Sequence, residues 1–217
     1  MPVFELNEQL VFPSAELAEP DGLLAVGGDL SEERLRLAYR SGLFPWYEGA
    51  QILWWTPDPR FVLFPAERKI STSMRSLLRK EAFRFTVNEA FGQVITQCKI
   101  IRRRGQAGTW INKEMVKAYT ALHHSGWAHS AEVWLNDQLV GGLYGIKMGK
   151  VFFGESMFSR VSNASKFAFL KYLERLEEEG VQLIDCQIYT PHLESLGARP
   201  IPRKEFVNLC PGRDEVS

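Results

Sequence analysis

Carboxylate and amide side chains occur in apolar segments that are predicted to form buried strands. Glu155 lies in the segment 151–158, and Asp185 and Gln187 lie near the end of the segment 181–188. Removing a carboxylate from water is costly unless the carboxylate is paired with a cation or hydrogen-bonded. We therefore expect these three side chains to belong to a functional site.

Asp185 and Gln187 are two residues apart, so on a regular strand their side chains point to the same face and can act together. Cys186 should point to the opposite face, into the core, and is not expected to be a nucleophile. An alternative interpretation is that Asp185 is a buried acid hydrogen-bonded to backbone amides. For Glu155 the alternative is a cross-strand ion pair with Arg160 or another base.

Hydrophobic periodicity predicts the elements that must position this site. Ser31 is a suitable N-cap for a helix that ends at Gly42. Further helices are predicted over 71–80, 88–98 and 112–125, and a last one is expected to be capped by Ser162 or Asn163 and to end at Gly180. Strands are predicted over 84–87, 128–135, 151–158 and 181–188, with a hairpin turn at Asn136 and Asp137. An antiparallel meander followed by a helix and a strand indicates an α+β fold.

The composition of the chain shifts near residues 57–60, where a segment rich in Gly, Pro and Trp gives way to regular amphipathic patterns. We place a boundary near residue 62, which predicts a small N-terminal domain, 1–62, and a larger C-terminal domain, 63–217. Ordered loops of the first domain are expected to hold Trp46, Trp54 and Trp55. Core filling is the simpler interpretation of any one of these tryptophans.

Composition and motifs exclude several classes of function. The 26 basic and 26 acidic residues balance, so nucleic-acid binding would need a local patch. Three cysteines without metal-ligand spacing fit a reducing compartment, and neither a bilayer-spanning apolar run nor a signal peptide is found. The histidines lack the spacing of a zinc site, and GxSxG and GxxxxGK[ST] motifs do not occur. We expect a cytoplasmic protein with no metal site and no membrane partner.

Three sets of motifs resemble the leucyl/phenylalanyl-tRNA–protein transferases, a bacterial family that moves an amino acid from its tRNA onto the N-terminus of a protein. The first set reads EPDGLLAVGGDL at 19–30, GLFPW at 42–46 and LWWTPDPR at 53–60. The second reads GTWI at 108–111, HSAEVW at 129–134 and LVGGLYG at 139–145. The third reads GESMFSR at 154–160, NASK at 163–166, DCQ at 185–187 and SLGA at 195–198. The match is specific, because these motifs are long, ordered and spread over most of the chain.

The resemblance implies a small N-terminal domain and an acetyltransferase-like (GNAT-type) C-terminal domain, whose mixed, largely antiparallel sheet is flanked by helices. It implies transfer of Leu or Phe, and less well Met, from aminoacyl-tRNA to proteins that begin with Arg or Lys, which marks them for N-end-rule degradation. Aminolysis of an ester needs no ATP, metal or redox cofactor. The segment 159–166 has no glycine that would let the backbone approach a pyrophosphate, so we expect no coenzyme A.

By position, the resemblance assigns the reaction centre to Asp185 and Gln187, and the contact with the acceptor's Arg or Lys to Glu155. We expect Gln187 to hold the amine and the ester, while Asp185 fixes Gln187 and attracts the cationic acceptor. The apolar pocket for the donor side chain maps onto Trp46, Trp110, Leu143, Met157, Tyr172, Leu176 and Ile184. The helical spacing within this set is by itself typical of plain core.

Basic residues around the helix predicted over 71–80 are expected to contact tRNA phosphates. Arg75 and Arg79 are one turn apart on the same face, and Lys80 follows them. A solvated helix face is the simpler interpretation of such a charge run. A second basic cluster, Lys99 and residues 102–104, precedes Gly105 and could add contacts.

Two other functions stay open at this point. A CoA-dependent N-acetyltransferase would share the fold, but it requires a phosphate-binding glycine loop. A non-catalytic tRNA-binding module would explain the basic helix, but not the combination of Asp185, Gln187 and Glu155.

Overall fold

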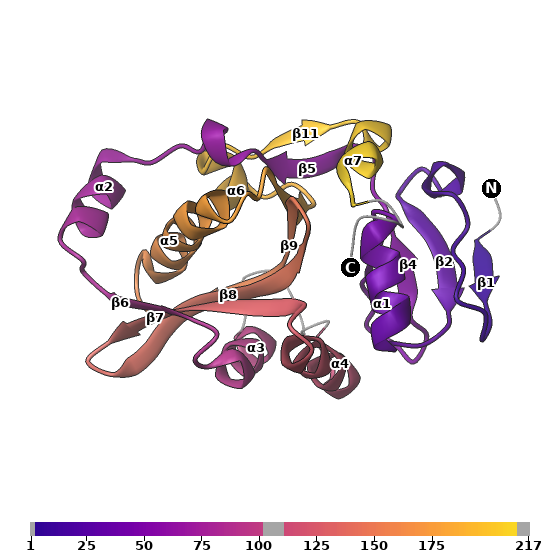
Figure 1. Ribbon diagram of the computed structural model, residues 1–217, viewed down its shortest axis with the longest axis horizontal. Coiled ribbons are helices and arrows are strands. Elements are labelled where there is room, and N and C mark those ends of the chain that lie inside the picture. Colours follow the sequence, from indigo (N-terminus) through magenta and orange to yellow (C-terminus); the bar gives the residue numbers. More distant parts are fainter. Residues whose placement is uncertain (1–2, 102–110, 212–217) are drawn as a thin grey trace.

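The computed structural model describes residues 3–101 and 111–211, and within these residues the strands form two sheets (Figure 1). The smaller sheet has the order β1-β2-β4-β3. Its strands are β1 (Phe4–Leu6), β2 (Leu23–Gly27), β3 (Phe44–Pro45) and β4 (Leu53–Trp55), and helix α1 (Glu32–Arg40) packs beside them. The predicted N-cap of α1 is confirmed, since the Ser31 hydroxyl accepts the backbone N–H of Arg34.

The larger sheet has the order β11-β5-β10-β9-β8-β7-β6. Its strands are β5 (Arg60–Leu63), β6 (Arg84–Val87), β7 (Ala128–Leu135), β8 (Gln138–Met148), β9 (Val151–Ser159), β10 (Leu183–Gln187) and β11 (Arg199–Ile201). Neighbouring strands are antiparallel except β9 and β10, which are parallel. The expectation of an α+β fold with a mixed, largely antiparallel sheet is confirmed.

Helices cover both faces of the larger sheet (Figure 1). The long helix α5 (Ala164–Glu178) packs on one face, with α2 (Thr72–Arg79) beyond it, while α3 (Phe91–Ile100) and α4 (Lys113–His124) pack on the other. Gly141 of β8 lets α5 approach closely, because a Cβ there would lie 2.7 Å from the Ala164 Cβ. The shorter helices are the 3-10 turns η1 (Ala15–Leu17) and η2 (Pro65–Glu67), and α6 (Pro191–Ser195) and α7 (Arg203–Leu209).

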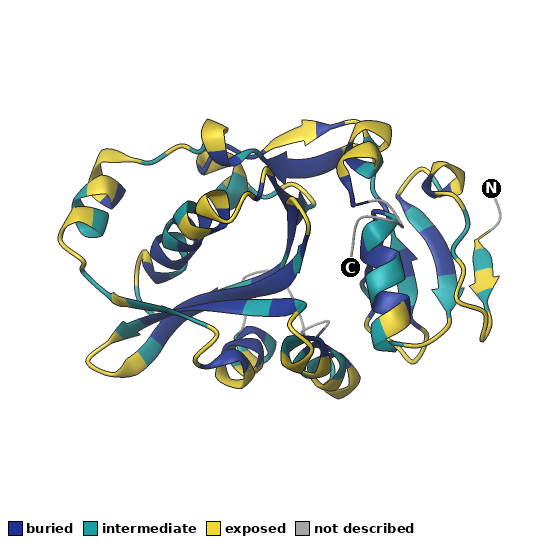
Figure 2. Ribbon diagram, in the orientation of Figure 1, coloured by how far each residue is buried: buried dark blue, intermediate teal, exposed yellow. Residues whose placement is uncertain are grey.

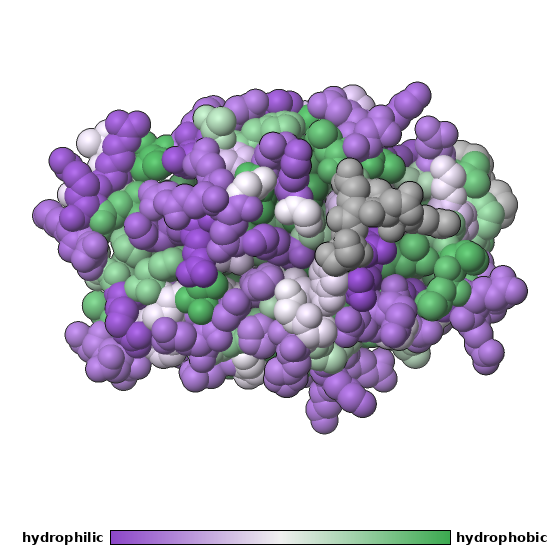
Figure 3. All heavy atoms as spheres, in the orientation of Figure 1, coloured by the Kyte–Doolittle hydropathy of each residue, from purple (hydrophilic) through white to green (hydrophobic). Residues whose placement is uncertain are grey.

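Two clusters of buried apolar residues form the core, one on each face of the larger sheet. One cluster lies under α5. The other continues without a break from Leu35 of α1 and Trp54 of β4 to Ile95 of α3 and Met115 of α4. The central strands are therefore buried (Figure 2), whereas hydrophilic side chains predominate on the face seen in Figure 3. The smaller sheet thus shares its core with the α3 and α4 face of the larger one.

The structure adds detail to the predicted domain boundary and to the predicted cap of the long helix. The proposed division at residue 62 falls inside β5, which pairs with β10 and β11 in the larger sheet. Asn163 stands before α5 but has a left-handed backbone (φ 68°) and makes no side-chain cap, so the predicted capping role is wrong. Instead the Ser159 hydroxyl accepts the N–H of Ser165 at 3.1 Å.

None of the helices in the described residues is both long and apolar enough to cross a membrane.

Candidate active site

The strands β9 and β10 diverge, and a cavity of about 360 Å³ opens where they separate. They are paired only over Val151–Phe153 and Leu183–Asp185. The cavity is lined by residues that follow this point on both strands, together with β3, β8, α5 and the segment leading into α6. Separation of two parallel strands thus exposes their side chains to a space that a substrate can enter.

A bulge lies on each strand beside the point of divergence. On β9, Ser156 pairs with Tyr144 and Gly154 with Gly145, so Glu155 is the extra residue. On β10, Asp185 pairs with Val62 and Gln187 with Phe61, which makes Cys186 the extra residue. Bulges re-aim side chains, and both Glu155 and Gln187 line the cavity.

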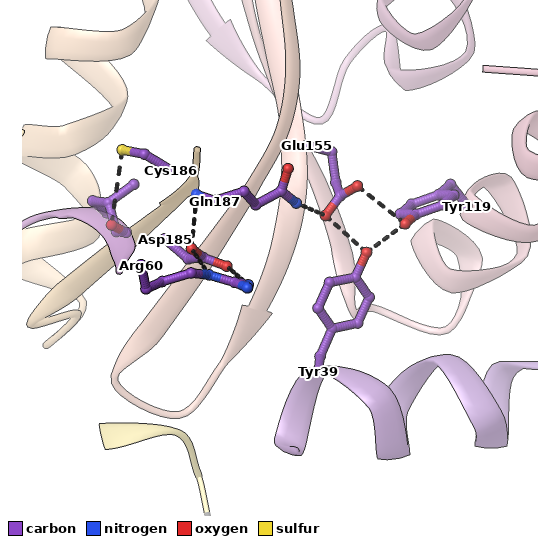
Figure 4. A network of polar contacts seen from close by, with 8 residues as sticks. Tyr39, Arg60, Tyr119, Glu155, Asp185, Cys186 and Gln187 are labelled. Atoms are coloured by element: carbon purple, nitrogen blue, oxygen red, sulfur yellow. Dashed lines mark hydrogen bonds and ion pairs between the residues drawn. The ribbon is translucent and has the colours of Figure 1, made fainter. Parts of the chain in front are cut away.

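Asp185 forms a fully buried ion pair with Arg60 of β5 (Figure 4). The Arg60 Nε donates to Asp185 Oδ1 at 2.8 Å, and Nη2 donates to Oδ2 at 2.6 Å. Paired N–H donors in this fork geometry match a carboxylate closely. The charge of Asp185 is therefore compensated inside the protein.

Two aromatic rings enclose the Arg60 guanidinium. Its central carbon lies 4.7 Å from the centre of the Phe44 ring and 4.5 Å from that of Phe206. Phe44 belongs to the smaller sheet and Phe206 to α7, so three distant parts of the chain meet around this cation. Cation–π contacts of a desolvated guanidinium are favourable, which helps to keep Arg60 in place.

Gln187 is held at both its backbone and its side chain (Figure 4). Its φ is 64°, a left-handed conformation that is uncommon for residues other than glycine. The backbone N–H donates to Asp185 Oδ1 at 2.8 Å, and Nε2 donates to Glu155 Oε1 at 3.1 Å. Because of the bulge, Asp185 and Gln187 meet through the backbone of Gln187, and simple alternation along a strand does not describe their arrangement.

Glu155 is buried and accepts hydrogen bonds from two tyrosines. The hydroxyl of Tyr39, from α1, lies 2.7 Å from Oε1, and that of Tyr119, from α4, lies 3.1 Å from Oε2. Burial raises the pKa of Glu155 to about 7, although both tyrosine hydrogen bonds lower it. The alternative of an ion pair with Arg160 is wrong, because Arg160 donates to Gln97.

The apolar wall contains four of the seven predicted pocket residues, namely Trp46, Leu143, Met157 and Ile184. Tyr172 and Leu176 are buried but do not line the cavity. The Tyr172 ring packs edge-on against Phe152, which does line it, so Tyr172 lies one layer behind the wall. On α5 the lining residue is Phe169, one turn nearer the cavity. Trp110 lies outside the described residues.

Sequence analysis missed Arg60, Tyr39 and Tyr119 as residues of the site. Arg60 closes the LWWTPDPR motif, so its place in that motif was an available signal. The tyrosines lie on amphipathic helices at positions that are typical of core. His192 of α6 was also missed; it lines the cavity, and burial followed by the charge of Lys166 lowers its pKa.

The geometry gives little support to a thiol nucleophile or to a metal site among the described residues. Cys186 is buried, its Sγ lies 3.9 Å from the carbonyl oxygen of Ile184, and burial raises the pKa of its thiol. Such a thiol is a poor nucleophile. Within 3–101 and 111–211, no three His, Cys, Asp or Glu side chains are grouped as metal ligands.

The predicted phosphate-binding residues Arg75, Arg79 and Lys80 are exposed on or just after α2. This helix lies at the end of the molecule opposite to the smaller sheet (Figure 1). Two other basic residues that flank this helix in the sequence make contacts elsewhere: Arg68 pairs with Glu177, and Arg84 packs on Trp134. Residues 102–104 of the second basic cluster lie outside the described residues.

Family models and similar known proteins point to the same family. A model described as "Leucyl/phenylalanyl-tRNA protein transferase" matches residues 62–210, and one for the N-terminal domain of that transferase matches residues 28–58. A leucyl/phenylalanyl-tRNA–protein transferase of Syntrophobacter fumaroxidans is 58% identical over 96% of this chain and 90% of its own length. One of Flavobacterium johnsoniae is 55% identical over 95% and 98%.

Solved structures are more distant. A GCN5-related N-acetyltransferase-like protein from Streptococcus suis covers 65% of this chain and 59% of its own, with 14% identity and a TM-score of 0.38. The family model and the two relatives, by contrast, each span well over half of the sequence. This chain belongs to the leucyl/phenylalanyl-tRNA–protein transferase family.

Proposed function

We propose that this protein transfers Leu or Phe, and less well Met, from aminoacyl-tRNA to the α-amino group of proteins that begin with Arg or Lys. The observation that carries the proposal is one cavity that is lined both by apolar side chains and by Glu155, Asp185 and Gln187. Close relatives over almost the whole chain are leucyl/phenylalanyl-tRNA–protein transferases. A tRNA substrate also favours a cytoplasmic location, and the modified proteins become targets for N-end-rule degradation.

The donor side chain fits the apolar wall. Leu143, Met157, Phe169 and Ile184 come from four different elements and offer a pliable surface without charge. Such a pocket distinguishes side chains by shape at about 1–3 kcal/mol per methylene group. Leu, Phe and Met should therefore be accepted and Val disfavoured, though not absolutely.

The acceptor cation fits Glu155. Arg60 is already paired with Asp185, so Asp185 offers no uncompensated charge to a second cation. Glu155, in contrast, is bound by neutral donors only. We assign the attraction of the acceptor's Arg or Lys to Glu155, and give Asp185 a positioning role.

The reaction joins an amine to an ester carbonyl and releases the tRNA hydroxyl. Gln187 donates through Nε2 to Glu155, which leaves its Oε1 as the acceptor for an N–H of the attacking amine. A neutral amide is a poor base, so Gln187 aligns the amine, and solvent or the ribose takes the proton. Alignment of this kind can supply about 7–11 kcal/mol of the barrier reduction.

Local geometry speaks against coenzyme A as the donor. In the segment between β9 and α5, the N–H of Ala164 donates to the Val161 carbonyl and that of Ser165 to the Ser159 hydroxyl. These first-turn amides are thus already used inside the protein, whereas a pyrophosphate site needs them free. An aminoacyl ester of tRNA needs no such site, nor ATP or a metal.

Single-turnover transfer of radiolabelled leucine from Leu-tRNA to a peptide that starts with Arg tests the proposal. Val-tRNA, a peptide that starts with Ala, and Asp185→Ala serve as controls. We expect transfer that falls in all three controls. A folded protein that binds Leu-tRNA without transferring leucine would instead favour a tRNA-binding module, and tight binding of CoA would favour an acetyltransferase.

A further inference from the structure

The hydrogen bonds around Glu155 need more hydrogen atoms than the tyrosines supply. Tyr39 contacts Oε1, Tyr119 contacts Oε2, and the two hydroxyls also contact each other (Figure 4). Each phenol carries one hydrogen, so two hydrogens are available for three oxygen–oxygen contacts. The carboxyl group of a protonated Glu155 would supply the third.

Protonation closes these contacts into a ring. Glu155 Oε2–H then donates to Tyr119, Tyr119 donates to Tyr39, and Tyr39 donates to Glu155 Oε1. With an ionised carboxylate, both tyrosines must donate to Glu155, and their two oxygens face each other with lone pairs only. The close contact between the two hydroxyls therefore fits the protonated acid.

The surroundings also favour a neutral group. The Arg60 charge is balanced by Asp185, and Gln187 contributes an uncharged amide. The Tyr144 ring packs edge-on against Tyr119. Burial raises the pKa of Glu155, the charge of Asp185 adds to the effect, and Arg60 partly offsets it. An ionised Glu155 would thus be a buried charge whose nearest cation is committed elsewhere.

Glu132 is a second buried glutamate, and its hydrogen bonds do not show this shortage of hydrogens. Glu132 is also fully buried and accepts from the Ser130 hydroxyl at 2.5 Å, the Thr86 hydroxyl at 2.6 Å and the Ala90 N–H at 3.4 Å. Each of these donors brings its own hydrogen, so this site is complete with an ionised carboxylate. Glu132 therefore serves as a matched control.

We propose that Glu155, in a hydrogen-bonded ring with Tyr39 and Tyr119, is a neutral acid until the cationic side chain of the acceptor displaces its proton into water. The inference rests on the proposed function, in which Glu155 binds that side chain. The O–H bond of the carboxyl group breaks, the proton passes to water, and the carboxylate pairs with the cation. Both tyrosines then donate to the carboxylate. Glu155 thereby determines specificity, because a neutral side chain cannot compensate the charge that proton loss creates.

Calorimetric titration with a peptide that starts with Arg measures the proton directly, when it is repeated in two buffers of different ionisation enthalpy. At pH 7, where Glu155 is half protonated, wild type should release about half a proton per peptide. Glu155→Gln, titrated to peptide concentrations that saturate its weaker site, should release less by that amount, since the peptide's own amine contributes equally to both proteins. Equal release from both proteins would overturn the proposal.

Infrared spectroscopy tests the ring without any peptide. The carbonyl stretch of a protonated carboxyl group should disappear with a midpoint near pH 7 in wild type, be absent in Glu155→Gln and persist in Glu132→Gln. A midpoint in the ordinary glutamate range would overturn the ring while leaving the transferase function intact. Failure of wild type to transfer leucine to an Arg peptide would contradict the proposed function. The carbonyl band would still show whether Glu155 is protonated in the ring.

Discussion

At the scale of single residues, the position of Gln187 depends on two acids with different partners. Asp185 holds its backbone and is itself held by Arg60, while Glu155 holds its side-chain amide and is itself held by tyrosines. The left-handed backbone of Gln187 costs conformational energy that these contacts offset. Gln187 is thus held by two hydrogen bonds in the absence of substrate, which suits the proposed role in alignment.

Replacement of Asp185 should therefore harm transfer more than replacement of Gln187. Asp185→Ala leaves the buried charge of Arg60 unpaired, at a cost of about 3–5 kcal/mol, and frees the Gln187 backbone. Gln187→Ala removes one amide and should lower the single-turnover rate about 10²-fold. Rates of both variants, with thermal melting to verify folding and Asp185→Asn as a milder change, test the ranking. A larger loss in Gln187→Ala would sink the positioning role of Asp185.

The protonation of Glu155 should also appear in the pH dependence of stability. Its folded-state pKa of about 7 lies above the ordinary value of 4.5, so the folded protein binds more protons than the unfolded chain between these values. The contribution of Glu155 to the free energy of unfolding is fully present below pH 4.5. About 3 kcal/mol of it is lost as the pH rises to about 7. Urea unfolding of wild type and Glu155→Gln at pH 5 and pH 8 measures it. A difference between the two proteins that is the same at both pH values would contradict the assignment.

At the scale of elements, two bulges at the divergence of β9 and β10 create the site. Regular alternation would send Glu155 and its neighbours to fixed faces, whereas each bulge adds one residue and turns the strand. Helix α5 packs closely on β8, and its Phe169 forms part of the apolar wall of the cavity.

Much of this scale could be predicted from the sequence. The strands at 84–87 and 128–135, the hairpin at Asn136 and Asp137 and the capped helix α1 form as expected, because each depends on local periodicity, turn residues or caps. The bulges could not be predicted, since a pattern of period two carries no mark of an extra residue. Nor could the pairing of Arg60 with Asp185, because contacts between residues 125 positions apart depend on the whole fold.

Because α5 packs closely on β8, replacing two glycines by alanine should have opposite effects on stability. Gly141→Ala should lower stability by about 1–3 kcal/mol, because its Cβ would lie 2.7 Å from Ala164. Gly92→Ala on α3 meets no atom within 4 Å and should raise stability by up to about 1 kcal/mol through helix propensity. Urea unfolding of both variants measures the two changes in stability. An equal effect of the two substitutions would speak against tight packing at Gly141.

At the scale of the whole molecule, the site lies where the larger sheet meets the smaller one, and the basic helix α2 lies at the far end (Figure 1). A tRNA whose aminoacyl end occupies the cavity would have to extend over the larger sheet to reach α2. Such contacts read the phosphate backbone and leave the choice of amino acid to the cavity.

Removal of the α2 charges should therefore weaken tRNA binding and reduce its salt dependence. For the double variant Arg75→Ala and Arg79→Ala, the slope of log K against log salt concentration should fall in magnitude by about 0.9 for each lost phosphate contact. Lys204→Ala, an exposed lysine on α7, is the matched control. Binding to Leu-tRNA at several salt concentrations measures the slope, and unchanged slopes in the double variant would place the phosphate track elsewhere.

The enclosure of Arg60 sets an order of events during synthesis. Arg60 leaves the ribosome 125 residues before Asp185, and Phe206 follows later still. Until then the cation lacks the counter-ion and one of the two rings that enclose it in the folded protein, and β5 also lacks both of its neighbours in the sheet. The site is thus completed only after Phe206 has been synthesised, and a shorter nascent chain lacks part of the enclosure that holds Arg60 and Asp185.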